Sequence, residues 1–282
     1  MKIMSIYTHP ADTITDCGGT LALHADRGDE VVALIVTHGG RKHPNKYEEE
    51  WRKEDPDMDI INAGIEEFKN DKKQELIRAA KIIGITNLIT MDYDDDFMVP
   101  EPEVIDKIAH HIAEERPDAI VMDYPAGGAF AGCHELTSSM ISVAIFRASE
   151  FTRNLDKIEA HHVKQIFYTK IPVTNRNMIG LSNMKSDMYV DITSVIERKM
   201  RAMDEFETQG YGGDFAKKFI ESHDGERGRS GGVNFAENFM RHSVETYDHL
   251  PITDYAMKRD MLTNHRDYST VIARDIKLKG DD

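Results

Sequence analysis

Residues 1–19, MKIMSIYTHPADTITDCGG, contain the pattern that decides the fold. Lys2–Thr8 is typical of a short buried strand, the tetrapeptide His9–Asp12 (HPAD) follows at once, and a helix then opens through Gly18 and Gly19. In open α/β sheets, ligands bind in the crevice at the carboxyl ends of the strands. A histidine and a carboxylate three residues apart at such a point are well placed to bind one metal ion. We therefore expect a ligand site directly after the first strand.

Strands and helices alternate regularly through the first half of the chain. Glu30–Thr37 (EVVALIVT) is a continuous, largely β-branched run, as expected of a buried parallel strand. Further strands are expected at Asn87–Met91 and Asp118–Met122, and helices at Gly18–Arg27, Asp71–Ile83, Glu101–Arg116 and Glu135–Ser149. The alternation predicts an α/β fold with a mostly parallel sheet and helices on both faces. Right-handed connections then put the polar loops after the four strands on one rim.

The rhythm weakens in the second half. We expect strands at Gln165–Thr169 and Met188–Asp191, a charged amphipathic helix at Ile192–Gln209 and a helical piece at Asn234–Arg241. Residues 210–232 are glycine-rich and polar, which favours a mobile lid or loop. Residues 47–70 are charged and only weakly periodic, and we expect a helical insertion over the site. Residues 1–282 are expected to form a single α/β domain that contains these segments.

Composition restricts the class of partner. The chain has 282 residues and a net charge of −15, which argues against a nucleic-acid partner because phosphate binding needs a basic face. No apolar run is long enough to span a bilayer, and the N-terminus lacks the pattern of a signal peptide. The two cysteines, Cys17 and Cys133, do not suggest a disulfide framework. We expect a cytoplasmic protein that does not bind membranes.

Three residues on the rim have the chemistry of a metal site. A zinc site that activates water commonly has three protein ligands and one open position. His9 and Asp12 would supply two ligands, and His134, which follows the fourth strand, is the natural third. Imidazole and carboxylate suit Zn2+, with Fe2+ and Mn2+ as alternatives. Each residue alone has a commoner role: His9 as a turn residue before proline, Asp12 as a helix N-cap, and His134 as a capping or core residue.

Other polar groups follow the second and third strands. His38 and Arg41 could bind an anionic group, although an exposed turn is the simpler interpretation. The acidic run Asp92–Asp96 is usually a solvated loop, although one carboxylate that faces the site could contact the substrate or act as a base. Gly18 and Gly19 do not complete a dinucleotide-binding pattern, and the chain has no phosphate-binding P-loop or nucleophile elbow.

Six ordered segments are similar to the motifs of one enzyme family. THPADTITDCGGTLA is similar to the family's AHPDDE and GCGGTLA motif without a gap, and residues 131–137 (AGCHELT) align with its H-P-D-H-x-A-T motif. The other resemblances are Lys73–Gly84 to an R-x-x-E helix, Glu115–Val121 to a P-D-x-V strand, residues 190–209 to the D-I-[ST] helix, and Phe235–Phe239 to Y-A-E-x-F. Together the six matches are specific and extend over most of the chain, which thus resembles the PIG-L/LmbE-like N-acetylglucosaminyl deacetylase superfamily.

The resemblance implies a Rossmann-like three-layer α/β sandwich that binds one divalent metal, usually zinc. It makes His9, Asp12 and His134 the metal ligands. In such deacetylases a zinc-activated water attacks an acetamide carbonyl, and the carboxylate next to the metal aspartate is the general base. Family habit also suggests a homo-oligomer and a small-molecule substrate.

The chain departs from these motifs at the positions of the acid and the base. The base position is Ala11, the motif's glutamate is Thr13, and in the third motif Ala131 and Cys133 replace a histidine and an aspartate. General acid–base assistance contributes about 10²–10⁴-fold in rate, so other residues must take over or the reaction must differ. The nearest candidates are Glu135, Asp95 and Asp16.

These departures leave three hypotheses open. The first is a zinc-dependent hydrolase that cleaves a C–N bond of a small polar, N-acetylated, sugar-like substrate. The second is a metal-dependent hydratase or lyase, because the 4-oxalomesaconate hydratases of the same superfamily resemble this chain in having alanine before the metal aspartate. His38 and Arg41 would then contact a carboxylate of the substrate. The third is a non-catalytic relative, which a purified protein without stoichiometric metal would favour.

Overall fold

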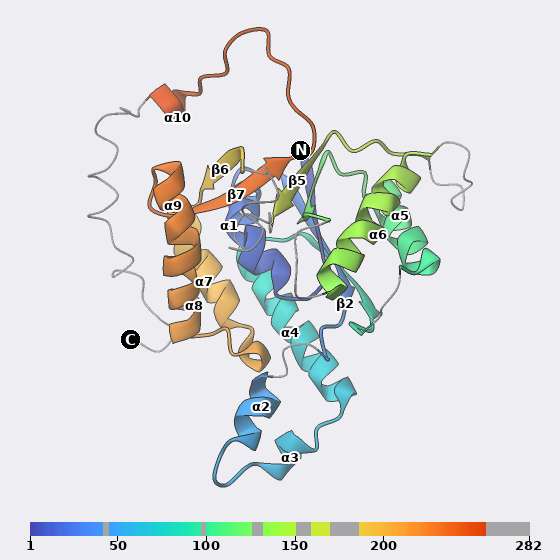
Figure 1. Ribbon diagram of the computed structural model, residues 1–282, viewed down its shortest axis with the longest axis vertical. Helices are drawn as coiled ribbons and strands as arrows, with labels where there is room; N and C mark the ends of the chain where they lie inside the picture. Colours follow the sequence, from blue (N-terminus) through green and yellow to red (C-terminus); the bar gives the residue numbers. More distant parts are fainter. Residues whose placement is uncertain (42–44, 97–99, 126–131, 151–158, 170–185, 258–282) are drawn as a thin grey trace.

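A seven-stranded sheet forms the centre of the molecule, with the strand order β3-β2-β1-β4-β5-β7-β6 (Figure 1). The computed structural model describes residues 1–41, 45–96, 100–125, 132–150, 159–169 and 186–257. The strands are β1 (Lys2–Tyr7), β2 (Glu30–Thr37), β3 (Asn87–Tyr93), β4 (Ala119–Asp123), β5 (Gln165–Thr169), β6 (Met188–Asp191) and β7 (Ala236–Arg241). Strands β1 to β5 are parallel to one another, whereas β7 is antiparallel to both β5 and β6. The predicted α/β fold with a mostly parallel sheet is confirmed.

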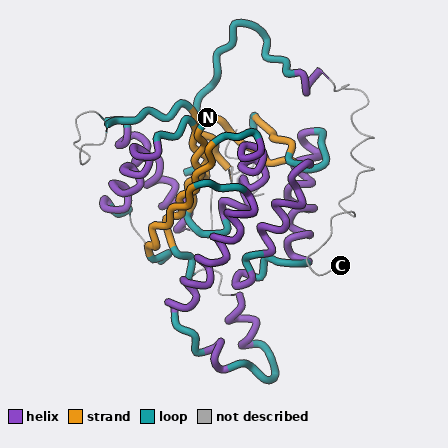
Figure 2. The backbone as a smooth tube through the Cα atoms, turned by 180° about the vertical axis from the view of Figure 1, so that it is seen from behind, coloured by secondary structure: helices purple, strands orange, loops and turns teal. Residues whose placement is uncertain are grey.

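Helices cover both faces of the sheet (Figures 1 and 2). One layer contains α1 (Asp12–Asp26), α4 (Ile65–Ile83) and α7 (Ile196–Asp204), and the other contains α5 (Pro102–Glu115) and α6 (Gly132–Ala148). Alternate residues of β1 enter the two layers, with Ile3 and Tyr7 in the first and Met4 and Ile6 in the second. Each fully buried aliphatic side chain contributes about 1.5–3 kcal/mol, so β1 is held from both sides.

Helix α1 begins earlier than the sequence suggested. It starts at Asp12, because the carbonyl of Ala11 accepts the backbone N–H groups of Ile14 and Thr15, both at 3.0 Å. The predicted start near Gly18 is therefore wrong, and this glycine lies in the middle of the helix. The polar tetrapeptide after β1 thus includes the first residue of a helix, where the helix dipole favours a carboxylate.

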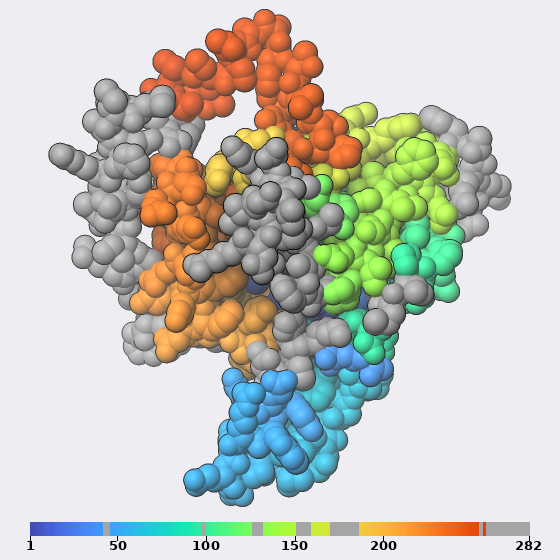
Figure 3. Space-filling view, viewed as in Figure 1, coloured from blue at the N-terminus to red at the C-terminus, as the bar shows by residue number. Residues whose placement is uncertain are grey.

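Residues 45–61 form two short helices, α2 (Asn45–Trp51) and α3 (Met58–Ile61), that protrude from the rest of the molecule (Figures 1 and 3). The helical character expected of residues 47–70 is confirmed, although residues 65–70 belong to α4, and the expected position over the site stays a prediction. Helix α4 then begins at Ile65, six residues earlier than predicted, and ends before Gly84, whose φ of 95° lies in the left-handed region that favours glycine.

The glycine-rich segment 210–232 is mostly helical, so the predicted loop is wrong for residues 214–231. It contains α8 (Asp214–Phe219), a π-helical turn (Ile220–Asp224) and α9 (Gly225–Gly231). A Cβ on Gly228 would collide with the backbone carbonyl of Asn234, so this glycine permits close packing rather than disorder. Movement of the segment as a lid stays a prediction, as does the single-domain organisation of the chain.

The predicted helix at Asn234–Arg241 is also wrong, because Ala236–Arg241 forms strand β7. Its backbone pairs with β5 on one side and with β6 on the other. Phe239 is buried in the core, and the buried Glu237 carboxylate accepts the backbone N–H groups of Gly19 and Thr20 at 2.8 and 2.7 Å. These tertiary contacts override the helix propensity of the segment.

The expected helix at Ile192–Gln209 is divided into a 3-10 turn (Thr193–Val195), α7 and a second 3-10 turn (Glu207–Gln209). Among the described residues, no helix has both the length and the apolar character needed to cross a membrane.

Candidate metal centre

His9 and Asp12 lie together in the turn between β1 and α1. The side chain of His9 is buried, and Asp12 Oδ2 accepts the backbone N–H of His9 at 2.8 Å. This bond fixes the carboxylate beside the imidazole, where Oδ2 lies 3.6 Å from His9 Nδ1. The turn therefore presents one nitrogen and one oxygen donor at the carboxyl edge of the sheet.

His134 joins this pair from the first turn of α6. Its Nδ1 lies 3.7 Å from Asp12 Oδ2, and the centroids of its ring and the His9 ring are 4.7 Å apart. The structure thus brings together the three residues that the sequence suggested as ligands. Whether they bind a metal stays a prediction.

Cys133 is a fourth potential donor that we did not include among the ligands. Its Sγ lies 3.7 Å from His9 Nε2, and donor atoms of His9, Cys133 and His134 are within 4.8 Å of one another. In a tetrahedral zinc site, bonds of 2.0–2.3 Å put neighbouring donors about 3.3–3.6 Å apart. One donor atom from each of His9, Cys133 and His134 lies within 4.8 Å of the others, which is wider than this spacing, so the side chains would move closer together on binding an ion. The combination of imidazole, carboxylate and thiol suits zinc better than a hard cation such as Mg2+.

The electrostatics of the centre favour a neutral imidazole at His9. Burial lowers the pKa of His9, and the charge of His134 acts in the same direction, whereas Asp12 and Asp95 oppose the shift. A neutral imidazole is the form that binds metal ions.

Lys72 is a second residue that sequence reasoning missed. It is buried on α4, and burial lowers its pKa to about 8, although the carboxylates of Glu75, Asp95 and Asp12 raise it. The signal was present in the sequence, because Lys72 precedes Leu76 by four residues on the apolar face of the helix. A lysine in that position is either paired in the interior or functional.

His38 and Arg41, suggested as anion contacts, lie beside the acidic residues that follow β3. His38 Nδ1 is 3.2 Å from Asp95 Oδ1, and the backbone N–H of Arg41 donates to both oxygens of Asp95 at 3.1 and 3.2 Å. The exposed guanidinium of Arg41 donates to Asp94 at 2.7 and 2.8 Å. Burial lowers the pKa of His38. An anion that binds to Arg41 would therefore compete with Asp94.

The three candidate acid–base residues have different surroundings. Asp95 is fully buried, and its charge raises the pKa of His9 against the larger effect of burial. Asp16 is buried on α1. The pKa of Tyr7 is raised first by burial and then by the nearby Cys17 and Asp16. Glu135 is half-buried on α6, one residue after His134. Ala11 is buried in the core, so no side-chain base stands next to Asp12, and Ala131 lies outside the described residues.

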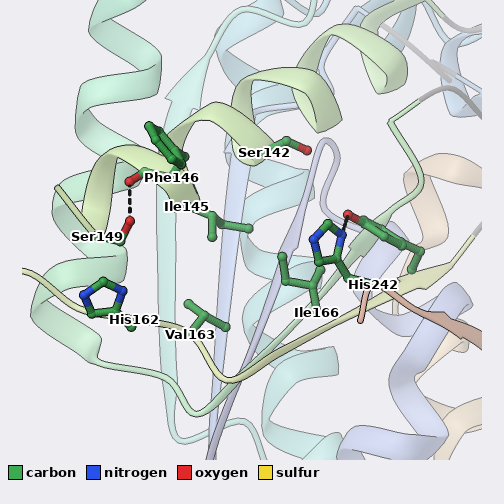
Figure 4. Close-up of a pocket in the computed structure, with 9 residues that line it drawn as sticks. Ser142, Ile145, Phe146, Ser149, His162, Val163, Ile166 and His242 are labelled. Carbon is green, nitrogen blue, oxygen red and sulfur yellow. Dashed lines mark hydrogen bonds between the residues drawn. The ribbon is translucent and has the colours of Figure 1, made fainter. Parts of the chain in front are cut away.

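Two cavities lie elsewhere in the described part of the molecule. One, of about 360 Å³, lies near the C-terminal end of α6, where Ile145, Phe146 and His242 line it (Figure 4). The other, of about 610 Å³, lies near the start of β1, and Ile3, Phe167 and Val190 are among its lining residues. Neither lining set includes His9, Asp12 or His134, so these cavities are separate from the candidate centre.

Comparison with known proteins gives a family match and several similar structures. The model of the PIG-L family, described as GlcNAc-PI de-N-acetylase, matches residues 4–145. Diacetylchitobiose deacetylase of Thermococcus kodakarensis is 24% identical over 220 residues, which are 74% of this chain and 70% of that protein.

Two solved structures illustrate the similarity of fold. The N,N'-diacetylchitobiose deacetylase of Pyrococcus horikoshii has a TM-score of 0.69 and 20% identity, with 85% of this chain and 83% of that one covered. The 4-carboxy-2-hydroxymuconate hydratase GalB of Pseudomonas putida also has a TM-score of 0.69, with 17% identity and 89% and 99% coverage. At these identities the structural similarity shows a shared fold.

Proposed function

The chain belongs to the PIG-L family of hydrolytic enzymes, and from this we propose that it is a zinc-dependent deacetylase. Its substrate would be a small polar molecule with an N-acetylated, sugar-like group, whose C–N bond is cleaved. The observation that carries the proposal is the convergence of His9, Asp12 and His134 at the carboxyl edge of the sheet. The diacetylchitobiose deacetylases with which it shares sequence and fold support this substrate class.

In this proposal His9, Asp12 and His134 hold the metal ion. The ion would activate a water molecule and polarise the acetamide carbonyl. Asp12 is held by the backbone N–H of His9, so its carboxylate is oriented before the ion binds. Burial keeps His9 neutral and ready to bind the ion through a ring nitrogen.

Asp95 is the most suitable of the three candidates for general base. Its carboxylate is fully buried in the loop after β3 and lies 3.2 Å from Nδ1 of His38, which follows β2 at the same edge of the sheet, whereas Asp16 lies inside α1. Asp95 would accept the proton of the attacking water, in place of the carboxylate that Ala11 lacks. The expected result for Asp95→Asn is full metal content and a fall in kcat of about 10²-fold or more. Unchanged kcat would rule out this role and leave Glu135 as the next candidate.

The polar groups beside Asp95 would bind the substrate. His38 is buried and Arg41 is exposed, so a polar group that enters from solvent would meet Arg41 first. Lys72 adds a buried cation on the same side of the centre, because Asp95 and Asp12 both act on its pKa. We also propose a cytoplasmic homo-oligomer, in keeping with family habit and the composition of the chain.

A metal-dependent hydratase or lyase that acts on a small keto or carboxylic acid is the second candidate. The observation that favours it is the identity of residue 11, an alanine, whose methyl side chain cannot serve as the base before Asp12. The shared fold of the hydratase GalB is consistent with this alternative. A cationic Arg41 and Lys72 would suit an anionic substrate.

Two assays with the same zinc-loaded protein separate these candidates. The deacetylase proposal predicts acetate release from N-acetylated amino sugars, and no release at full zinc occupancy would contradict it. The hydratase alternative predicts a metal-dependent change in the absorbance of unsaturated keto acids. Chelated protein is the control in both assays.

A further inference from the structure

Asp123, the last residue of β4, contacts the candidate ligand His134. Its Oδ2 lies 3.0 Å from His134 Nδ1, closer than the 3.7 Å between that nitrogen and Asp12 Oδ2. The side chain of Asp123 is 5% exposed and that of His134 14%, so the contact is largely shielded from water. Nothing in the HPAD or AGCHELT motifs pointed to this residue.

A row of hydroxyl groups connects Asp123 to two neighbouring strands. Thr169 Oγ1 donates to Asp123 Oδ1 at 3.1 Å, and Tyr7 Oη lies 2.8 Å from Thr169 Oγ1. Asp123 and Thr169 are direct partners in the register of β4 and β5, and Tyr7 ends β1 on the other side of β4. All three residues are buried. The row therefore crosses three adjacent strands at the carboxyl edge of the sheet.

The direction of these hydrogen bonds follows from the chemistry of the groups. A carboxylate accepts hydrogen bonds and has no proton to donate. His134 must therefore donate from Nδ1–H to Asp123. The Thr169 hydroxyl proton is directed at Asp123 Oδ1 at 3.1 Å, with the Met122 carbonyl as a more distant acceptor at 3.4 Å, so Tyr7 is the donor in its contact with Thr169. A neutral imidazole protonated at Nδ1 has its lone pair on Nε2, where a metal ion can bind.

We propose that Asp123, supported by Thr169 and Tyr7, is a positioning residue that holds His134 as its Nδ1–H tautomer and aims Nε2 at the metal. The inference rests on the proposed function, because that proposal makes His134 a metal ligand. Carboxylates that hold ligand histidines in this way typically contribute 10–100-fold to metal affinity.

The proposal predicts a graded series of effects. Asp123→Asn should weaken zinc binding by about 10–100-fold, because the carboxamide can turn its NH2 group toward His134 and reverse the tautomer. Thr169→Val removes one hydrogen bond to the carboxylate and should have a smaller effect. Tyr7→Phe acts only through Thr169 and should have the smallest effect. If the row only filled space, Tyr7, the largest of the three, would matter most instead.

Nitrogen-15 NMR of metal-free protein with labelled histidines, at pH 8, tests the tautomer directly. The chain has 13 histidines, so His134→Gln identifies the signal of His134 by difference. We expect a protonated Nδ1 in the unsubstituted protein and a change of tautomer in Asp123→Asn. Asp118→Asn is the matched control, because Asp118 accepts the backbone N–H of Lys2 at 2.8 Å just before the start of β4. It should alter neither the His134 signal nor zinc affinity.

An Nε2–H tautomer in the unsubstituted protein would overturn the proposal, as would an Asp123→Asn protein that retains both the Nδ1–H tautomer and its zinc affinity. The NMR measurement needs neither metal nor substrate. A protein that shows the predicted tautomer but releases no acetate would contradict the deacetylase proposal and leave the positioning role intact. Circular dichroism of each variant would establish that it is folded.

Discussion

Substitution of Gly19 by alanine tests how α1, which carries Asp12, is fixed to the rest of the molecule. A Cβ on Gly19 would lie 2.8 Å from Cβ and Cγ2 of Ile192 and 2.9 Å from its Cδ1. Ile192 is fully buried, and its backbone N–H is bonded to the Phe235 carbonyl at 3.0 Å, so it cannot easily move away. Overpacking of this kind destabilises proteins by about 1–3 kcal/mol. Alanine also gains about 1 kcal/mol over glycine in a helix. Taking the upper end of the overpacking range, we expect a net loss of about 2 kcal/mol.

Gly18 provides a matched control in the same helix. There a Cβ would be 3.4 Å from Ile14 Cγ2 and 3.7 Å from its next neighbours, which are ordinary contacts. Gly18→Ala should therefore gain about 1 kcal/mol from helix propensity alone. Urea unfolding should separate the two variants by about 3 kcal/mol. Equal midpoints, or a Gly19→Ala protein more stable than Gly18→Ala, would refute the reasoning.

Further substitutions test the metal centre, the interior and the rim. Asp12→Ala and His134→Ala should each abolish stoichiometric metal binding in elemental analysis, whereas Asp95→Asn and Glu135→Gln should retain the metal because neither residue is a proposed ligand; full metal content in His134→Ala would contradict the ligand set. Lys199→Met should lower the free energy of unfolding by about 3–5 kcal/mol, because it leaves two buried carboxylates without their cation at 2.7 and 2.8 Å; an unchanged urea midpoint would argue against this. Arg41→Ala should raise KM more than it lowers kcat in steady-state assays, since Arg41 is exposed at the rim; a selective fall in kcat would assign it a different role.

Much of the fold follows from local sequence patterns. Glu30–Thr37 was predicted with its observed bounds. A continuous apolar run of this length that is rich in β-branched residues is typical of a buried strand and is too short for a buried helix. Strand β7 could not be predicted in this way. Its sequence, AENFMR, contains good helix formers, and the contacts that make it a strand come from β5, β6 and α1.

The candidate centre was predictable where a motif marks it. His9, Asp12 and His134 lie together because each follows a parallel strand at the same edge of the sheet. Lys72 and Asp123 belong to no such motif, and although the helical spacing marks Lys72 as buried, it does not show which groups this lysine meets. Lys72 lies on α4, a helix of the layer that covers the sheet. The contact of Asp123 with Thr169 depends on the register between β4 and β5. Contacts of this kind depend on three-dimensional packing, which local sequence patterns do not specify.

The central claim is that this chain is a metal-dependent deacetylase, and acetate release is its most direct test. Protein loaded with one zinc ion should release acetate from an N-acetylated amino sugar, should lose this activity after chelation, and should regain it when zinc is restored. Zinc-loaded protein that releases no acetate, yet hydrates an unsaturated keto acid in a metal-dependent reaction, would contradict the claim.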